Sequence, residues 1–318
     1  MAILHLILLG MRTYLGIDVG GTNIKSGVVT EEGEILLYEK THTPTLRKKP
    51  SFAKELIKLI GNYLAQYPEI EDIGVGLPGT LNKTRTHTIE LPNIPELDNY
   101  PLLEELNSNF PNKNFILEND ANAAALGEMY FGPNKMPDDY LFITLGTGVG
   151  GAIVLDRQIF KGGDGNSGEF GHMVSRGGKR LEVLIGKKGF ISMAKKAIKK
   201  YGDDTQLTQA DSINTRVLME AAINGDKVTL EIFKKAGILL GEAIVSVIRV
   251  LDIKNVYIGG GISSTYEFLE VGVQEALKKS LTSYYLKDLH VQRAEMENQA
   301  GVLGAASLCI GRQQQTTA

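Results

Sequence analysis

The chain has 318 residues, of which 43% are apolar and 22% are charged, and because this length exceeds the ~100–200 residues of one typical domain we expect two lobes with separate cores. The formal net charge is −3, and the most basic stretch (195–200) has apolar residues at helical spacing and is followed by Asp203 and Asp204, which excludes a broad nucleic-acid-binding surface. The single cysteine, Cys309, excludes an internal disulfide framework and a multi-cysteine metal site and indicates a reducing compartment such as the cytoplasm.

The first ten residues, MAILHLILLG, form an apolar stretch. They lack the basic start and the small-residue cleavage pattern of a signal peptide, and the stretch is too short to span a bilayer. We interpret it as an upstream extension, with translation beginning at Met1 or Met11, and we expect no membrane partner.

The stretch LGIDVGGTNIKSGVV (15–29) predicts two β-strands, 15–19 and 24–29, around a tight glycine turn at 20–23. EEGE predicts a further turn before a strand that starts at Ile35. An aspartate, Asp18, stands near the end of the first strand, where an apolar residue would be ordinary.

A helix and two strands follow. Ser51 is a suitable N-cap for a helix whose apolar face carries Phe52, Leu56, Ile60 and Leu64. IEDIGVGLPG (70–79) predicts a strand that ends in a Pro-Gly turn. NFILENDANAAALGEMYFG (114–132) predicts a short strand that runs into an alanine-rich helix.

The order of strand, glycine turn and strand returns in YLFITLGTGVGGAIVLDRQIF (140–160). Here 146–148 form the first turn, 152–155 the second strand, and Asp156-Arg157 the next turn. Asp18 and Thr144 are separated by the same offset in numbering as Gly20 and Gly146. One offset between two long units indicates a duplicated lobe.

Beyond residue 185 the pattern is mostly helical until NVYIGGGIS (255–263), a strand that breaks at three glycines before a helix from about Tyr266. QAGVLGAASLCIG (299–311) predicts a helix of small residues that can pack closely. No Pro/Ser-rich linker occurs. We expect an N-terminal α/β lobe of 12–119 plus 299–318, closed by the C-terminal helix, and a C-terminal α/β lobe of 120–298.

The two glycine turns suit anion binding. Glycines let a bulky anion approach backbone N–H groups, and threonine hydroxyls add donors. Two such turns, one from each lobe, could hold a polyphosphate. Each alone could equally be a tight hairpin turn without a ligand.

Six stretches carry a resemblance to the ROK family of sugar kinases, in the family's order: GIDVGGTNIKSGVV, GVGLPG, LENDANAAALGE, TLGTGVGGAIV, GGDGNSGEFGHM and VYIGGGIS. The chain from Leu15 to about Leu308 is similar to this family, which belongs to the actin, hexokinase and Hsp70 ATPase fold group. The resemblance implies a two-lobed α/β protein of duplicated ribonuclease H-like domains, a homodimer, and ATP-dependent phosphate transfer to a hexose hydroxyl in a cleft between the lobes.

On the ATP side, Asp18 resembles the carboxylate that holds hydrated Mg²⁺ against the β- and γ-phosphates, although it could instead pin its own turn. The glycines of IGGGIS resemble the turn against which the adenosine lies, and a strand-to-helix loop without a ligand has the same pattern. The residues that the resemblance places around Mg-ATP are Gly20, Gly21, Thr22, Asn23, Lys25, Gly146, Thr147, Gly148, Gly259, Gly260 and Gly261.

On the sugar side, Asp120 resembles the general base. A hexose hydroxyl is too weakly acidic to ionise at neutral pH, so a carboxylate that accepts its proton is worth ~10²–10⁴ in rate. Asp and Asn before an alanine-rich run are also what a helix N-cap requires, and the two roles do not exclude each other. The residues that the resemblance places around the hexose are Gly79, Asn93, Asn119, Asp120, Glu169, His172 and Glu182.

The segment after GEFGH departs from the family. Glu169 and His172 offer acceptors and a donor that suit adjacent sugar hydroxyls, but relatives follow this histidine with C-x-C-G-x-x-G-C-x-E, whose three cysteines hold a structural Zn²⁺ with the histidine. This chain has the shorter, cysteine-free MVSRGGKRLEVLIGKKG (173–189), in which Glu182 matches the glutamate that ends the motif. We expect no zinc site, and the sequence does not identify what orients His172.

We expect a cytoplasmic kinase that phosphorylates glucose at O6. N-Acetylmannosamine, N-acetylglucosamine and fructose are alternative acceptors, and polyphosphate is an alternative donor. A non-catalytic sugar sensor is a second class, disfavoured by the retention of Asp18, Asp120, Glu169 and His172. A sugar-responsive repressor of this family would carry an N-terminal helix-turn-helix domain, and we expect none because only about a dozen residues precede the first strand.

Overall fold

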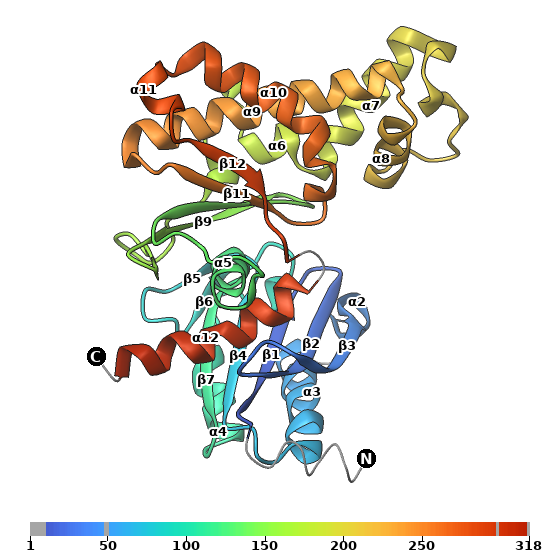
Figure 1. Cartoon of the computed structure of the whole chain (residues 1–318). Coiled ribbons are helices and arrows are strands. Elements are labelled where there is room, and N and C mark those ends of the chain that lie inside the picture. The colour runs from blue at the N-terminus through green and yellow to red at the C-terminus, as the bar shows by residue number, and fades with distance from the viewer. Residues whose placement is uncertain (1–10, 48–50, 297–298, 317–318) are drawn as a thin grey trace. The chain divides into compact units, whose positions relative to one another are not determined.

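The computed structural model describes residues 11–47, 51–296 and 299–316 (Figure 1). The first ten residues, on which the choice between Met1 and Met11 depends, lie outside the described residues. The chain divides into two compact units, the described parts of 1–136, 159–167 and 298–318 on one hand, and 137–158 with 168–296 on the other. Within the described ranges, every helix is too short or too polar to cross a membrane.

The first unit is built on a five-stranded sheet in the order β3-β2-β1-β4-β7. Its first three strands are antiparallel neighbours, whereas β1, β4 and β7 run parallel. The strands of this sheet are β1 (Thr13–Val19), β2 (Asn23–Thr30), β3 (Ile35–His42), β4 (Asp72–Leu77) and β7 (Asn114–Asn119), and a small second sheet pairs β5 (Thr80–Leu81) with β6 (Thr88–Glu90). The helices are α2 (Thr43–Arg47), α3 (Phe52–Gln66), α4 (Leu102–Asn109), α5 (Asp120–Phe131), α12 (Ala300–Thr316) and the short 3₁₀ helix η1 (Pro95–Leu97).

Alternation along β1 decides which helix covers which face of this sheet. Leu15 and Ile17 point into a core that also contains Leu56 and Ile60 of α3. Glycines face α12 on the other side, where a Cβ at Gly74 would stand 1.8 Å from the Ala305 carbonyl oxygen. These small residues let α12 lie close against the sheet, as Figure 1 shows. The predicted close-packing C-terminal helix is therefore confirmed.

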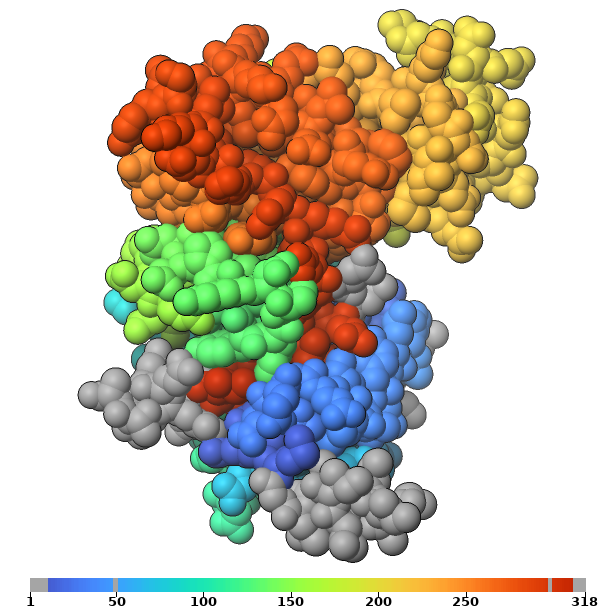
Figure 2. All heavy atoms as spheres, in the orientation of Figure 1, coloured from blue at the N-terminus to red at the C-terminus, as the bar shows by residue number. Residues whose placement is uncertain are grey.

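The second unit repeats this architecture with the strand order β10-β9-β8-β11-β12. Its strands are β8 (Tyr140–Leu145), β9 (Val149–Leu155), β10 (Gln158–Ile159), β11 (Asn255–Gly259) and β12 (His290–Arg293). Its helices are α6 (Leu181–Ile185), α7 (Lys187–Tyr201), α8 (Thr215–Ile223), α9 (Lys227–Leu251), α10 (Tyr266–Ser280) and α11 (Ser283–Leu286), with the 3₁₀ helices η2 (Phe170–His172), η3 (Arg176–Gly178), η4 (Gly202–Asp204), η5 (Gln206–Gln209) and η6 (Ser263–Thr265). The orange residues of α9 and α10 form much of the helical surface of this unit (Figure 2).

The register of the two sheets confirms the duplication. Asp18 of β1 lies opposite Gly76 of β4, and Thr144 of β8 lies opposite Gly259 of β11. In both sheets the first strand pairs antiparallel with the second and parallel with the fourth. The offset read from the two glycine turns therefore relates structurally equivalent strands.

The observed division differs from the expected lobes in two places. Helix α5 belongs to the first unit rather than the second, because Gly127 packs so closely on α12 that a Cβ there would stand 2.8 Å from Gly304 Cα. Residues 159–167 also belong to the first unit.

Strand β9 begins at Val149 rather than at 152, since both glycines at 150 and 151 pair with β8.

Candidate functional site

Three parallel strands of the first unit end at one sheet edge, which is where α/β proteins bind ligands. Asp18 on β1 is opposite Gly76 on β4, and Gly76 is opposite Glu118 on β7. The Cα of Asp120, the residue that opens α5, lies 3.7 Å from the position of a Cβ built on Gly76. The fold therefore gathers Asp18 and Asp120 around the same glycine.

The capping role falls to Asn119 and not to Asp120. The Asn119 Oδ1 accepts hydrogen bonds from the backbone N–H groups of Ala121 (2.9 Å) and Asn122 (3.2 Å), which satisfies two of the free donors of the helix. Asp120 is the first helical residue, and its Oδ1 accepts from the N–H of Ala121 at 2.8 Å. The N-cap of α5 is therefore Asn119, and Asp120 occupies the first helical position.

Gly79 connects this edge to the neighbouring turn. The Asn119 Nδ2 donates to the Gly79 carbonyl oxygen at 3.2 Å. The φ of Gly79 is +108°, and a Cβ there would stand 2.3 Å from the Glu90 carbonyl oxygen. Only glycine can make this turn, and the turn holds the amide of Asn119 in place.

Asp18 is a largely buried carboxylate, with 16% of its side chain exposed. Its Oδ2 lies 3.2 Å from Lys25 Nζ, and a Cβ on Gly301, in the first turn of α12, would stand 2.1 Å from the same oxygen. Burial raises the pKa of Asp18 above its ordinary value, and the Lys25 ammonium partly opposes this shift. Lys25 and Asp18, two of the predicted ATP-side residues, therefore form an ion pair.

The first glycine turn is braced by a residue that the sequence did not identify. Gly20 N–H donates to the Asn23 carbonyl oxygen at 3.0 Å, and Thr43 binds the carbonyl oxygens of both Thr22 (N–H, 3.0 Å) and Gly20 (Oγ1, 2.6 Å). Thr43 follows β3, and nothing in its local pattern signals this contact. A Cβ at Gly21 would stand 2.6 Å from Asn93 Cβ. Asn93 therefore lies against the turn.

The second glycine turn, between β8 and β9, is braced in a similar way. The backbone N–H of Lys187, at the start of α7, donates to the carbonyl oxygens of Gly146 (3.0 Å) and Thr147 (3.3 Å). The Oε2 of Glu182 lies 3.0 Å from the position of a Cβ on Gly148. Lys187 carries no sequence signal for this role, and Glu182 joins the turn to the predicted sugar-side residues.

His172 stands between two carboxylates of the second unit. Its Nδ1 lies 3.8 Å from Glu169 Oε2, and its Nε2 lies 3.6 Å from Glu182 Oε1. About half of the histidine side chain is exposed (53%). The structure thus brings together the three residues of this unit that were predicted to contact a hexose, including Glu182 across the shortened loop.

A short hairpin occupies the place of the cysteine motif. Residues 173–181 fold back through backbone bonds, including Ser175 N–H to the Lys179 carbonyl oxygen at 2.7 Å. Arg176 at the hairpin tip forms a two-pronged ion pair with Glu242 of α9, with Nε 3.0 Å from Oε2. Backbone closure and this anchor fix the chain directly after His172, which the sequence alone did not explain.

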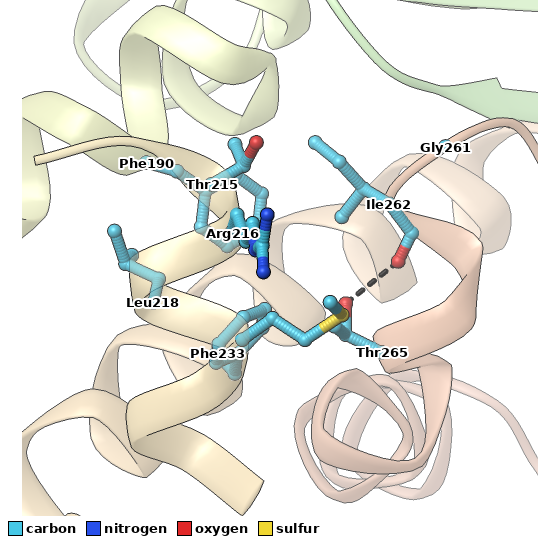
Figure 3. Close-up of a pocket in the computed structure, with 9 residues that line it drawn as sticks. Phe190, Thr215, Arg216, Leu218, Phe233, Gly261, Ile262 and Thr265 are labelled. Carbon is cyan, nitrogen blue, oxygen red and sulfur yellow. Dashed lines mark hydrogen bonds between the residues drawn. The ribbon is translucent and has the colours of Figure 1, made fainter.

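The last glycine of the triplet, Gly261, borders a small pocket of the second unit. Strand β11 ends at Gly259, and Gly260 has a φ of +85°. Beside Gly261 lies a pocket of about 240 Å³. Figure 3 shows its apolar side chains together with Arg216, and a hydrogen bond from Thr265 Oγ1 to the Ile262 carbonyl oxygen (2.6 Å) that closes one wall. The apolar side chains lining it include Phe190, Leu218, Phe233 and Ile262.

The predicted site residues therefore form two groups. The first unit carries Asp18, Gly79, Asn119 and Asp120 at one sheet edge, with Asn93 against the turn 20–23. The second unit carries the turn 146–148, the cluster around His172, and the glycines beside the pocket.

Comparison with known proteins identifies the family of this chain. The ROK family model matches residues 14–312. A glucokinase from Thermotoga maritima is 31% identical over 309 residues, covering 92% of this chain and 96% of that protein. A solved structure from Cytophaga hutchinsonii ATCC 33406 is 38% identical with a TM-score of 0.88, covering 94% of this chain and 99% of that chain.

A ROK family glucokinase from Streptomyces griseus, solved in complex with glucose and AMPPNP, is 28% identical with a TM-score of 0.78, covering 95% of this chain and 100% of that chain. The matched sequence extends over nearly the whole chain, and the duplicated sheets agree with the fold of these structures. The chain belongs to the ROK family and has its actin/hexokinase-like ATPase fold.

Proposed function

We propose that this ROK protein transfers the γ-phosphoryl group of ATP to a hexose hydroxyl, and that its preferred acceptor is glucose, phosphorylated at O6. The observation that carries the proposal is the position of Asp120, which opens α5 beside Gly76 while Asn119 caps the helix. The names of the relatives support the substrate: glucokinases are 31% and 28% identical to this chain over almost its full length.

Asp120 acts as the general base in this proposal. Its carboxylate accepts the proton of the hexose hydroxyl as the oxygen attacks the γ-phosphorus, an effect worth ~10²–10⁴ in rate. The neighbouring amide of Asn119 and the carbonyl-lined turn at Gly79 orient the sugar at the same sheet edge.

The hexose is recognised by polar groups of complementary kinds. Glu169 and Glu182 offer acceptors for sugar hydroxyls, and His172 between them offers ring nitrogens that can donate or accept a hydrogen bond. Asn93 adds a side-chain amide beside the first turn. A set of fixed acceptors and donors selects a polyhydroxylated ligand over an apolar one, because an apolar ligand would cover these groups without replacing their hydrogen bonds to water.

The two glycine turns cradle the phosphates through backbone N–H groups, since Thr43 and Lys187 already bind their carbonyl oxygens. The pocket beside Gly261 receives the adenine. Its volume of about 240 Å³ is below the ~300–1,000 Å³ of pockets for whole ligands, so it suits a base rather than a whole nucleotide. Its apolar walls favour ATP over polyphosphate as donor.

Asp18 fits the magnesium ion that such a reaction requires. Mg²⁺ keeps several waters and binds through one or two carboxylates plus substrate phosphates, so one carboxylate at a strand end beside the phosphate turn is a sufficient donor set. When bound, Mg²⁺ neutralises charge on the β- and γ-phosphates. We also propose that the protein is a cytoplasmic homodimer, as its family resemblance implies.

The test is a panel of acceptors and donors. Sugar phosphate is measured by mass spectrometry for glucose, fructose, N-acetylglucosamine and N-acetylmannosamine, each with Mg-ATP and with polyphosphate. We expect the highest kcat/KM for glucose with ATP. A higher value for another sugar reassigns the acceptor, and glucose binding without turnover of any acceptor favours a sensor and contradicts the kinase.

A further inference from the structure

Arg85 is a buried cation that joins three segments of the first unit. The residue lies in the turn between β5 and β6 and is 7% exposed. One terminal nitrogen, Nη2, lies 2.8 Å from Glu118 Oε1 and donates to the Gly165 carbonyl oxygen at 2.5 Å. The other, Nη1, donates to the Asn82 carbonyl oxygen at 3.2 Å. A planar guanidinium can hold several acceptors at fixed angles in this way.

Glu118 connects Arg85 to the residue proposed as the base. It is buried (4% exposed) and stands two positions before Asp120. Besides Arg85, its Oε1 accepts from the backbone N–H of Asn119 (2.9 Å) and from Asn122 Nδ2 (3.0 Å). The carboxylate therefore binds the end of β7 to the first turn of α5, on both sides of Asp120.

The other partner of Arg85 lies just before the proposed hexose contacts. Gly165 belongs to the segment 159–167, which is part of the first unit. Two more contacts hold this segment: Leu81 N–H donates to Asn166 Oδ1 at 3.3 Å, and Lys161 Nζ lies 3.7 Å from Glu118 Oε2. The chain then continues through Gly168 to Glu169. Arg85 thus connects the first turn of α5 with the segment that immediately precedes the GEFGH stretch.

Stability alone does not account for this arrangement. A buried ion pair is on average no better for stability than apolar residues of the same volume. The Arg85 Nε is buried and has no hydrogen-bond partner among the described residues, which costs free energy. Its backbone φ is +58°, a region that is costly for a side chain of this size. Such costs are typical of residues kept for the geometry they impose.

We propose that Arg85 is a positioning residue that couples the hexose-contacting stretch at Glu169–His172 to the base Asp120, through Gly165 on one side and Glu118 on the other. The expected changes in kcat and KM rest on the proposed hexose kinase activity. The expected changes in amide exchange rest on the contacts above. Ordering of 168–172 by the sugar is transmitted to the first turn of α5, where the proton is taken.

The test compares Arg85→Lys with Arg12→Lys. Lysine at 85 keeps a charge beside Glu118 but cannot also span the carbonyl oxygens of Gly165 and Asn82. Arg12, whose side chain is about half exposed, forms an ion pair of the same 2.8 Å length with Asp72 at the start of β4, the opposite end of the sheet from Asp18. For both variants, kcat and KM are measured for glucose and for ATP, with amide hydrogen exchange of 160–169 and 118–122 with and without glucose.

For Arg85→Lys we expect a glucose KM raised by about ten-fold or more with a lower kcat, an unchanged ATP KM, faster exchange at 160–169, and loss of glucose protection at 118–122. Arg12→Lys should match the wild type. A variant that is merely less stable would lower kcat through the active fraction without this KM split. Wild-type kinetics and exchange in Arg85→Lys, or equal changes in both variants, would overturn the proposal.

Two further arms keep the outcomes distinguishable. If Arg85→Lys does not fold, the double variant Arg85→Met/Glu118→Gln removes both charges together. The same kinetic and exchange measurements apply, and we expect the same changes as for Arg85→Lys. If the wild type phosphorylates no hexose, the proposed function fails. Exchange at 160–169 then still decides whether Arg85 holds this segment: faster exchange in the variant supports the role, and unchanged exchange refutes it.

Discussion

Gly301, in the first turn of α12, makes room for the carboxylate of Asp18: a Cβ at position 301 would stand 2.1 Å from Asp18 Oδ2 and 3.0 Å from its Cβ. The C-terminal helix therefore sets the position of a residue near the end of the first strand. Because the nearest obstructing atoms are Oδ2 and Cγ at the end of the Asp18 side chain, an added methyl group moves the carboxylate before it disturbs the backbone.

Gly301→Ala tests this relationship. Displacement of a reacting or metal-holding group by about 1 Å costs roughly up to 10²-fold in rate, so we expect kcat to fall by that order while the glucose KM and the Tm change little. Gly61→Ala in α3 is the matched control, since its Cβ would meet only ordinary contacts with Phe110 at 3.7 Å. Equal activity in both variants would contradict a fixed position for Asp18.

Asp18→Asn should separate stability from activity. Burial raises the pKa of Asp18, so the folded state binds the proton of this carboxyl more tightly than the unfolded state does. The associated stability is present below the ordinary pKa of 3.8 and is lost as pH rises through the raised value. At neutral pH the ionised carboxylate therefore costs stability.

The expected result for Asp18→Asn is a Tm at pH 7 higher by roughly 2–4 °C, the shift that about 1 kcal/mol produces in a domain of 150–250 residues, with a strong loss of phosphoryl transfer. Thermal melts at several pH values check the sign, because the gain should shrink as the pH falls towards 4. A lower Tm at pH 7 would show that the ion pair with Lys25 outweighs burial.

Much of both units follows from local sequence. Ser51 caps α3, α10 begins at Tyr266, and β4 ends before the Pro-Gly turn, all as the patterns predict. These features depend on periodicity and on residue preferences at element ends, which neighbouring residues report directly.

Other features depend on contacts between distant segments. Either Asn119 or Asp120 could cap α5 by sequence, and only the hydrogen bonds assign the role to Asn119. Thr43 and Lys187 brace the glycine turns through backbone carbonyl oxygens, a contact that leaves no periodic pattern. The place of α5 in the first unit follows from its packing on α12, almost two hundred positions later in the chain.

The hairpin at 173–181 leads to a prediction about zinc. Its backbone bonds and the pair between Arg176 and Glu242 close the loop without cysteine ligands. A zinc-selective chelator, added with Mg²⁺ in excess, should leave the Tm and the turnover unchanged. Metal analysis that finds one equivalent of zinc in the purified protein would contradict this assignment of the hairpin.

Gly261→Val tests the adenine pocket. A Cβ at Gly261 meets no heavy atom within 4 Å, so the fold should tolerate the change, and the larger side chain narrows the pocket that Gly261 lines. We expect the ATP KM to rise by about ten-fold and the glucose KM to stay constant. Any turnover with polyphosphate should be unaffected. An unchanged ATP KM would show that the adenine binds elsewhere.

Kinetics of Asp120→Asn show whether Asp120 takes the proton of the hexose hydroxyl. Single-turnover phosphorylation and calorimetric glucose binding are measured together, with Ser51→Ala as the control that removes the N-cap of α3 at a cost of about 1 kcal/mol in stability. For Asp120→Asn we expect a single-turnover rate constant lower by ~10²–10⁴, with glucose binding and Tm retained. Turnover near the wild-type rate in Asp120→Asn would contradict the role of Asp120 as the base.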